Sequence, residues 1–148
     1  MAGIKNIIIA AILLCFTSGC CQNWVSTIDE AKALAQKENK NILLVFSGSD
    51  WCAPCIKLDK NVWATNAFKQ EATANWILLK ADFPKKKANA LPEEQQKQNA
   101  ALSDKYNKEG NFPLVVVMDA NGKTLGKTGY KNVTPAEYIA LLHSLEKK

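Results

Sequence analysis

The 148-residue sequence contains no arginine, so all 19 of its basic side chains are lysines. Sites that bind nucleic acids or phosphates favour the planar, bidentate guanidinium of arginine. The lysines are scattered along the chain, and we interpret the basic run PKKKA at residues 84–88 as a solvated loop. We therefore expect no nucleic-acid-binding role.

Histidine and methionine are also scarce, with one and two residues respectively. A structural zinc site needs about four cysteine or histidine ligands. The chain offers one CxxC pair, Cys52 and Cys55, and His143 near the end of the last amphipathic segment. This disfavours zinc, and His143 fits a surface or helix-terminal residue better than a catalyst. We expect neither a metal nor an organic cofactor.

The first residues have the layout of a secretory signal. MAGIK carries one positive charge, the following NIIIAAILLCF is mostly apolar, and TSGCC then consists of residues with small side chains. The apolar run is shorter than the roughly 20 residues that span a bilayer. TSGC resembles the lipobox of bacterial lipoproteins, in which the cysteine, here Cys20, is lipidated, although that motif prefers leucine where Thr17 stands.

We therefore expect a signal peptide at 1–19, a tether at 20–26 and one domain at 27–148. The lipid on Cys20 would anchor the chain to a bacterial membrane in the cell envelope or periplasm. Plain signal cleavage with secretion is the alternative. If Cys20 is lipidated, Cys21 would be an odd thiol near the membrane; otherwise Cys20 and Cys21 would both be free thiols.

The remaining chain is long enough for one domain with its own core. NILLVF is a continuous apolar run typical of a strand buried on both faces. Helices between strands predict crossover connections and a mostly parallel sheet, which ends in an antiparallel hairpin and a final helix. The predicted helices are 27–38, 54–63, 66–75, 92–107 and 135–146, and the predicted strands are 41–46, 76–83, 113–119 and 124–129.

The CxxC pair lies where a buried strand gives way to a helix that Pro54 opens. Helix N-termini lower the pKa of a thiol, so Cys52 is the predicted nucleophile. Cys55 follows one turn later and is the predicted resolving thiol, which would release a mixed disulfide. A permanently closed structural disulfide is the alternative, but so small a ring constrains the unfolded chain little.

DWCAPCIKLDK after a buried strand, with FP opening a later strand, resembles the thioredoxin superfamily. The order of elements from 27 to 147 is similar as well. The resemblance implies an α/β, three-layer α/β/α sandwich with a mixed sheet, and a cis Phe112–Pro113 peptide beside Cys52. The residues that it assigns to substrate binding are Trp51, Ala53, Pro54, Phe112 and Pro113.

One position departs from the thioredoxins, which carry a buried aspartate six residues before the first cysteine, where this chain has Phe46. SDWCAPCIKLD is more similar to the C-terminal periplasmic domain of transmembrane thiol:disulfide interchange reductases. That subgroup has an acid matching Asp59, which we interpret as a candidate for proton transfer. A solvated aspartate between Lys57 and Lys60 is the alternative.

These features predict an exported thiol:disulfide oxidoreductase, and the proline in CAPC resembles the reducing members of the superfamily. Its expected partners are protein disulfides and an upstream membrane electron donor, and we expect a monomer. The alternatives are a Cu(I)-binding module, since thiolates select soft metals, and a disulfide oxidase or isomerase. The polar segment 84–100 serves either partner recognition or solvation, and Trp24, Trp63 and Trp76 are interpreted as packing residues.

Overall fold

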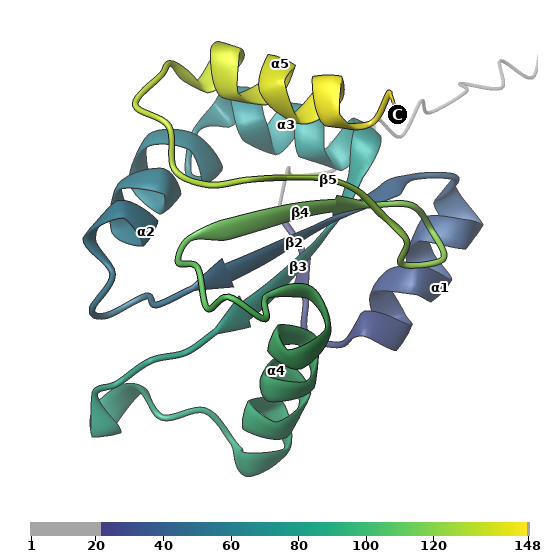
Figure 1. Cartoon of the computed structure of the whole chain (residues 1–148). Helices are drawn as coiled ribbons and strands as arrows, with labels where there is room; N and C mark the ends of the chain where they lie inside the picture. Colours follow the sequence, from purple (N-terminus) through teal and green to yellow (C-terminus); the bar gives the residue numbers. More distant parts are fainter. Residues whose placement is uncertain (1–21, 148) are drawn as a thin grey trace, which may run out of the picture.

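The computed structural model describes residues 22–147, so the predicted signal peptide, Cys20 and Cys21 lie outside the described residues. Strands and helices alternate along this part of the chain (Figure 1). In order they are β1 (Trp24–Val25), α1 (Ile28–Glu38), β2 (Asn41–Ser47), α2 (Ala53–Leu58), η1 (Asp59–Trp63), α3 (Asn66–Asn75), β3 (Trp76–Asp82), η2 (Lys87–Asn89), α4 (Glu93–Tyr106), β4 (Leu114–Met118), β5 (Thr124–Thr128) and α5 (Pro135–Leu145).

Side-chain caps start three of the helices close to where the sequence predicts. Thr27 and Thr65 accept hydrogen bonds from backbone N–H groups in the first turns of α1 and α3. Thr134 and Glu137 form a reciprocal capping box at α5, and Pro135 occupies the first turn, where its missing N–H leaves no bond unmade.

The sheet is mixed, with the strand order β1-β3-β2-β4-β5. Strand β3 runs parallel to β1 and β2, whereas β4 is antiparallel to both β2 and β5. The prediction of a mostly parallel sheet was therefore wrong at β4. The register explains it: Asp82 at the end of β3 and Leu114 at the start of β4 both lie at the C-terminal end of β2, so the connection returns to the end that it left.

The predicted tether also contains structure, because Trp24 and Val25 pair with Leu78 and Leu79 as an edge strand. A strand of two residues has no periodicity that a sequence could show. Its formation depends on the unpaired edge that β3 offers.

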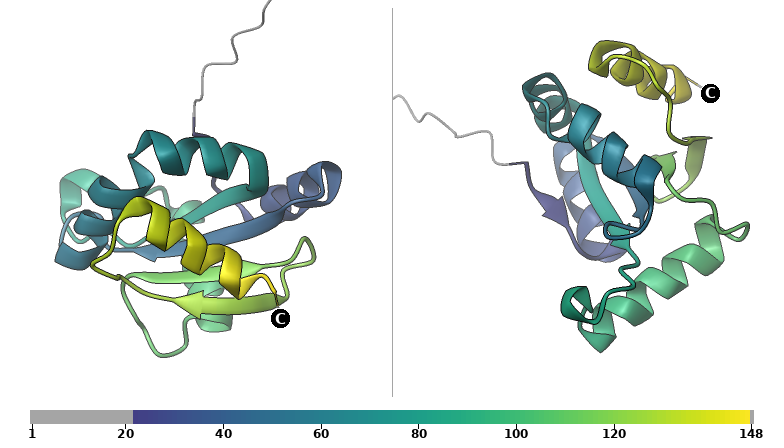
Figure 2. Two further views of the ribbon diagram at one scale, coloured as in Figure 1. Left: turned by 90° about the horizontal axis from the view of Figure 1, so that it is seen from above. Right: turned by 90° about the vertical axis from the view of Figure 1, so that its left-hand side faces the viewer.

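Helices cover both faces of the sheet, as the three-layer prediction requires. Helices α1 and α4 pack on one face, and α2, α3 and α5 on the other (Figure 1). Figure 2 (left) shows α3 and α5 side by side on the second face. Residues 42–47 of β2 are all buried, so the continuous apolar run is indeed a two-sided core strand.

The predicted single helix after Pro54 changes at Asp59 into a wider π-helical turn, in which the Ala64 N–H donates to the Asp59 carbonyl at 2.9 Å. This turn buries Trp63 against Phe68 and Tyr138, with ring centroids 4.4 and 5.5 Å away. Among residues 22–147, none of the helices has both the length and the apolar character needed to cross a membrane.

Candidate redox site

Cys52 and Cys55 are joined by a disulfide at the C-terminal end of β2, where α2 begins. Cys52 is the N-cap of α2, and its sulfur accepts a hydrogen bond from the Cys55 N–H at 3.3 Å. Both cysteines are buried, with 4% and 3% of their surfaces exposed. An N–H aimed at the Cys52 sulfur favours its thiolate once the pair is reduced.

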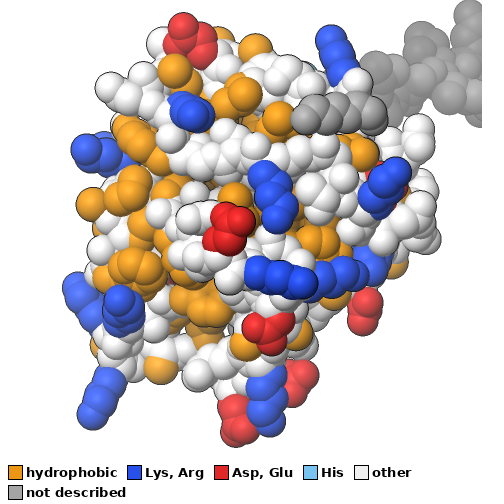
Figure 3. All heavy atoms as spheres, viewed as in Figure 1, with side chains coloured by type: hydrophobic (Ala, Val, Ile, Leu, Met, Phe, Trp, Pro, Cys, Tyr) orange, Lys and Arg blue, Asp and Glu red, His pale blue; other side chains and the backbone are white. Residues whose placement is uncertain are grey.

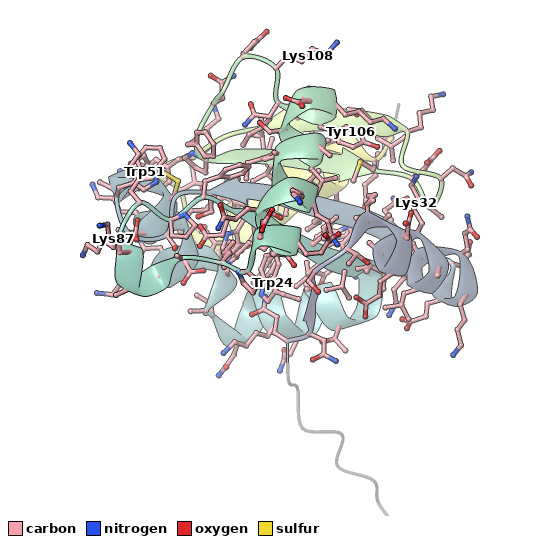
Figure 4. The ribbon with its side chains drawn as sticks, turned by 90° about the horizontal axis from the view of Figure 1, so that it is seen from below. Trp24, Lys32, Trp51, Lys87, Tyr106 and Lys108 are labelled. Carbon is pink, nitrogen blue, oxygen red and sulfur yellow. A yellow bond between two sulfur atoms is a disulfide. The ribbon has the colours of Figure 1, made fainter. Side chains whose placement is uncertain are left out.

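Trp51 forms the exposed wall beside the disulfide, as Figure 4 shows, with 39% of its surface accessible. Its indole Nε1–H donates to the Phe83 carbonyl at 2.7 Å. Its ring meets Phe112 edge-on at 5.4 Å between centroids. The indole also lies directly over Gly48, so close that a Cβ there would be 2.3 Å from the ring.

The Phe112–Pro113 peptide is cis, as the resemblance implies. The backbone of the segment after β5 approaches this proline, since a Cβ on Gly129 would lie 3.3 Å from the Pro113 carbonyl oxygen. The buried Tyr138 holds that segment by donating its hydroxyl hydrogen to the Gly129 carbonyl at 2.9 Å. Phe46 near the end of β2 pairs with Leu114, and the Trp51 ring contacts Phe112. Cys52, Trp51 and the cis proline therefore lie at one end of the sheet.

The remaining predicted substrate contacts lie on the outer side of α2. Ala53 is exposed and Pro54 is half-buried. Ile56 also has 47% of its surface accessible, an unusual exposure for a large apolar side chain. These residues extend an apolar surface from Trp51 along the start of α2.

The predicted proton-transfer residue, Asp59, lies in η1 and is 58% exposed. Its carboxylate forms an ion pair with the Lys80 ammonium at 3.2 Å, which joins η1 to β3. Lys80 in turn lies over the Trp24 ring at 4.8 Å. Phe46, at the position of the thioredoxin aspartate, is fully buried.

Asp50 is a residue of the site that the sequence did not reveal. Its carboxylate accepts hydrogen bonds from the backbone N–H groups of Lys85 (2.9 Å) and Lys86 (3.0 Å) and from the Asn89 side chain (2.9 Å). The N–H of Lys85, followed by the Asn89 amide, lowers the pKa of Asp50. No local signal could have indicated this, because the donors lie more than 30 residues away along the chain.

A second polar connection joins the same two segments. Asp82 accepts from the backbone N–H of Ser49 at 2.9 Å and from its hydroxyl at 2.6 Å. The buried Asn99 of α4 donates to the Asp82 carbonyl at 2.8 Å. The segment after β3 is therefore fixed to the turn that carries Cys52.

His143 lies away from the disulfide, in the last turn of α5, as the sequence suggested. It is nevertheless not a simple surface residue, because it bridges Glu71 of α3 (2.7 Å) and Glu146 (3.0 Å). Trp76 also donates to Glu146. Separately, the described part of the chain contains no group of three or more His, Cys, Asp or Glu side chains that could hold a metal ion.

The comparisons with known proteins agree with this geometry. Residues 23–120 match a family model described as thioredoxin-like. The disulfide bond reductase DsbH of Chlamydia pneumoniae is 36% identical over 115 residues, which are 78% of this chain and 68% of that protein. A solved DsbH oxidoreductase structure superposes with a TM-score of 0.77 at 35% identity, covering 84% of each chain.

The oxidised C-terminal domain of Neisseria meningitidis DsbD shares the fold, with a TM-score of 0.51 at 18% identity over 78% of this chain and 90% of that domain. At this identity the similarity concerns the fold. The extent of the family match and the identity to DsbH establish the relationship. The chain belongs to the thioredoxin-like family.

Proposed function

We propose that this protein is a thiol:disulfide oxidoreductase that works as a reductase of protein disulfides through Cys52 and Cys55. The observation that carries the proposal is the CxxC disulfide at the start of α2, at the same end of the sheet as the cis Phe112–Pro113 peptide. The 36% identity to a disulfide bond reductase supports the direction of the reaction.

The catalytic cycle starts when a donor dithiol transfers two electrons to the Cys52–Cys55 disulfide. The Cys52 thiolate then attacks one sulfur of a substrate disulfide, forms a mixed disulfide and expels the other substrate sulfur as a thiolate. Cys55 loses its proton and attacks the Cys52 sulfur. This step restores the Cys52–Cys55 disulfide and releases the second substrate thiol, so the substrate gains the two electrons.

The substrate lies across Trp51 and the start of α2, where the exposed apolar surface adjoins the disulfide. The backbone of Phe112 before the cis proline pairs with an extended substrate strand. Asp59, with Lys80 as its ion-pair partner, takes up the Cys55 proton. Asp59→Asn tests this role: it should slow substrate release without slowing formation of the mixed disulfide, and equal effects on both steps would reject it.

We extend the proposal to the location of the protein. TSGC at residues 17–20 supports export and lipidation of Cys20, which would place the domain on a membrane in the cell envelope near a membrane-bound electron donor. Intact mass of the membrane fraction tests this directly. A mature chain that starts at a lipid-modified Cys20 supports the anchor, and an unmodified chain contradicts it.

The reduction potential of the Cys52–Cys55 couple, measured in glutathione or dithiothreitol buffers, tests the direction of electron flow. A value of about −270 to −230 mV, in the range of thioredoxins and glutaredoxins, supports a reductase. A value near about −120 mV indicates an oxidant. The absence of a reversible couple would favour the metal-binding module instead.

The Cys55→Ser variant tests the cysteine roles. It should accumulate mixed disulfides on Cys52, because the thiol that resolves them is gone. The matched control is Cys52→Ser, which should trap none. Equal trapping by both variants would contradict the assignment of Cys52 as the nucleophile.

A further inference from the structure

The segment between β3 and α4 is long and polar, yet its backbone is fixed beside the disulfide. Asp50, two residues before Cys52, accepts both backbone N–H groups of Lys85 and Lys86. The Asn89 side chain donates to the same carboxylate at 2.9 Å. These hydrogen bonds hold the backbone of the segment next to the turn that carries Cys52.

This segment presents three consecutive exposed lysines, Lys85, Lys86 and Lys87, which we call the lysine rim. The Lys85 ammonium lies 4.0 Å from the centroid of the Trp51 ring. Figure 4 shows Lys87 and Trp51 at the same end of the molecule as the disulfide, with Lys32 at the opposite end. A substrate that contacts Trp51 therefore passes close to the rim.

Two nearby carboxylates offset part of the positive charge of the rim. That of Asp50 accepts three hydrogen bonds from the rim segment, and that of Asp82 accepts two from Ser49. Figure 3 shows lysine side chains gathered at the lower left, where Figure 1 places the segment after β3. The three exposed lysines of the rim outnumber these two carboxylates, so the face beside Trp51 keeps an excess of positive charge next to its apolar surface.

We propose that the lysine rim selects disulfide substrates in which acidic residues flank the reactive cysteine. The inference rests on the proposed function and names its substrate class. Complementary charge at a binding site raises the rate of productive encounter and weakens with salt. An acidic polypeptide fits better than an anionic membrane, because Lys85 is stacked on the residue that adjoins the disulfide.

The test uses three disulfide-linked peptides of equal length whose cysteine flanks are acidic, neutral or basic. The rate constant for their reduction by the dithiol form of the protein is measured at low and high salt. We expect the acidic peptide to react roughly tenfold faster than the basic one at low salt, at the lower end of electrostatic steering. Their rates should converge at high salt.

The K85Q/K86Q/K87Q variant should lose the preference for the acidic peptide. The matched control K32Q/K37Q/K123Q removes the same charge from α1 and the β4–β5 turn, at the other end of the sheet, and should keep the preference. Circular dichroism and thermal unfolding of both variants establish that they remain folded.

The outcomes separate this inference from the proposed function. Failure of the wild-type protein to reduce the neutral peptide contradicts the function itself. Equal rates on acidic and basic peptides, or an equal loss of preference in both variants, overturn the inference alone. A membrane role for the lysine rim would also overturn the inference. It would appear as equal rates on the three peptides, together with binding to phosphatidylglycerol vesicles by the wild-type protein but not by K85Q/K86Q/K87Q.

Discussion

Gly48→Ala is the sharpest test of how the site is held together. The new methyl group would lie 2.3 Å from the Trp51 ring, whereas ordinary carbon contacts lie beyond about 3.4 Å. The indole must therefore move by about 1 Å. Gly48 does not have a positive φ, so the substitution introduces no backbone strain of its own.

Three interactions of Trp51 depend on the position of its ring. The hydrogen bond to the Phe83 carbonyl is worth about 1 kcal/mol. The edge contact with Phe112 is worth about 0.5–1.5 kcal/mol. The Lys85 contact adds about 0.5–1 kcal/mol at an exposed site. Because Trp51 is partly exposed, water replaces part of these three interactions. We therefore expect their loss to lower the free energy of unfolding by about 2 kcal/mol.

A double-mutant cycle measures this cost. Urea unfolding of the oxidised protein gives the free energies of unfolding of wild type, Gly48→Ala, Trp51→Ala and the double variant. Alanine lowers the entropy of the unfolded chain, which offsets about 0.4–1 kcal/mol in both backgrounds. Gly48→Ala should therefore destabilise the wild type by about 1–2 kcal/mol and be neutral or slightly stabilising without Trp51.

The coupling free energy between the two positions should be about 2 kcal/mol. If Gly48→Ala costs the same with and without Trp51, the ring contact is not the cause. The account of how Trp51 is positioned would then be wrong.

Two further predictions concern groups outside the disulfide. Asp50→Asn removes the carboxylate that holds the segment after β3. Endoproteinase Lys-C should therefore cut after Lys85, Lys86 or Lys87 faster than in the wild type, while the midpoint of urea unfolding hardly changes. Unchanged cleavage would contradict the role of Asp50. Burial lowers the pKa of His143, but its bonds to Glu146 and Glu71 outweigh this, so the net pKa is raised above 6.5. A raised pKa stabilises the fold below the unfolded-state value near 6.5, and this contribution is lost as pH rises through the folded-state pKa. His143→Gln should therefore flatten the fall in unfolding free energy as the pH rises above about 6.5, and an unchanged pH dependence would exclude His143 as its source.

Features that depend on neighbouring residues could be predicted from the amino-acid sequence. The apolar run of β2, the helical segments 27–38 and 135–146 and the CxxC spacing are local patterns, and the predicted bounds of β2, α1 and α5 lie within one residue of the structure. The disulfide could be read in the same way, since Cys52 and Cys55 are one helical turn apart. The cis peptide at Pro113 came from the family resemblance.

Contacts between residues far apart in the chain could be found only in the folded structure. The antiparallel direction of β4, the edge strand at Trp24 and the attachment of the segment after β3 to Asp50 all join positions separated by about 30 residues or more. The ion pair of Asp59 with Lys80 spans 21 residues and the bridge from His143 to Glu71 spans 72, so these contacts are non-local as well. A hydrogen bond or ion pair across such distances leaves no periodicity in the sequence, because its geometry exists only after the sheet and helices have packed.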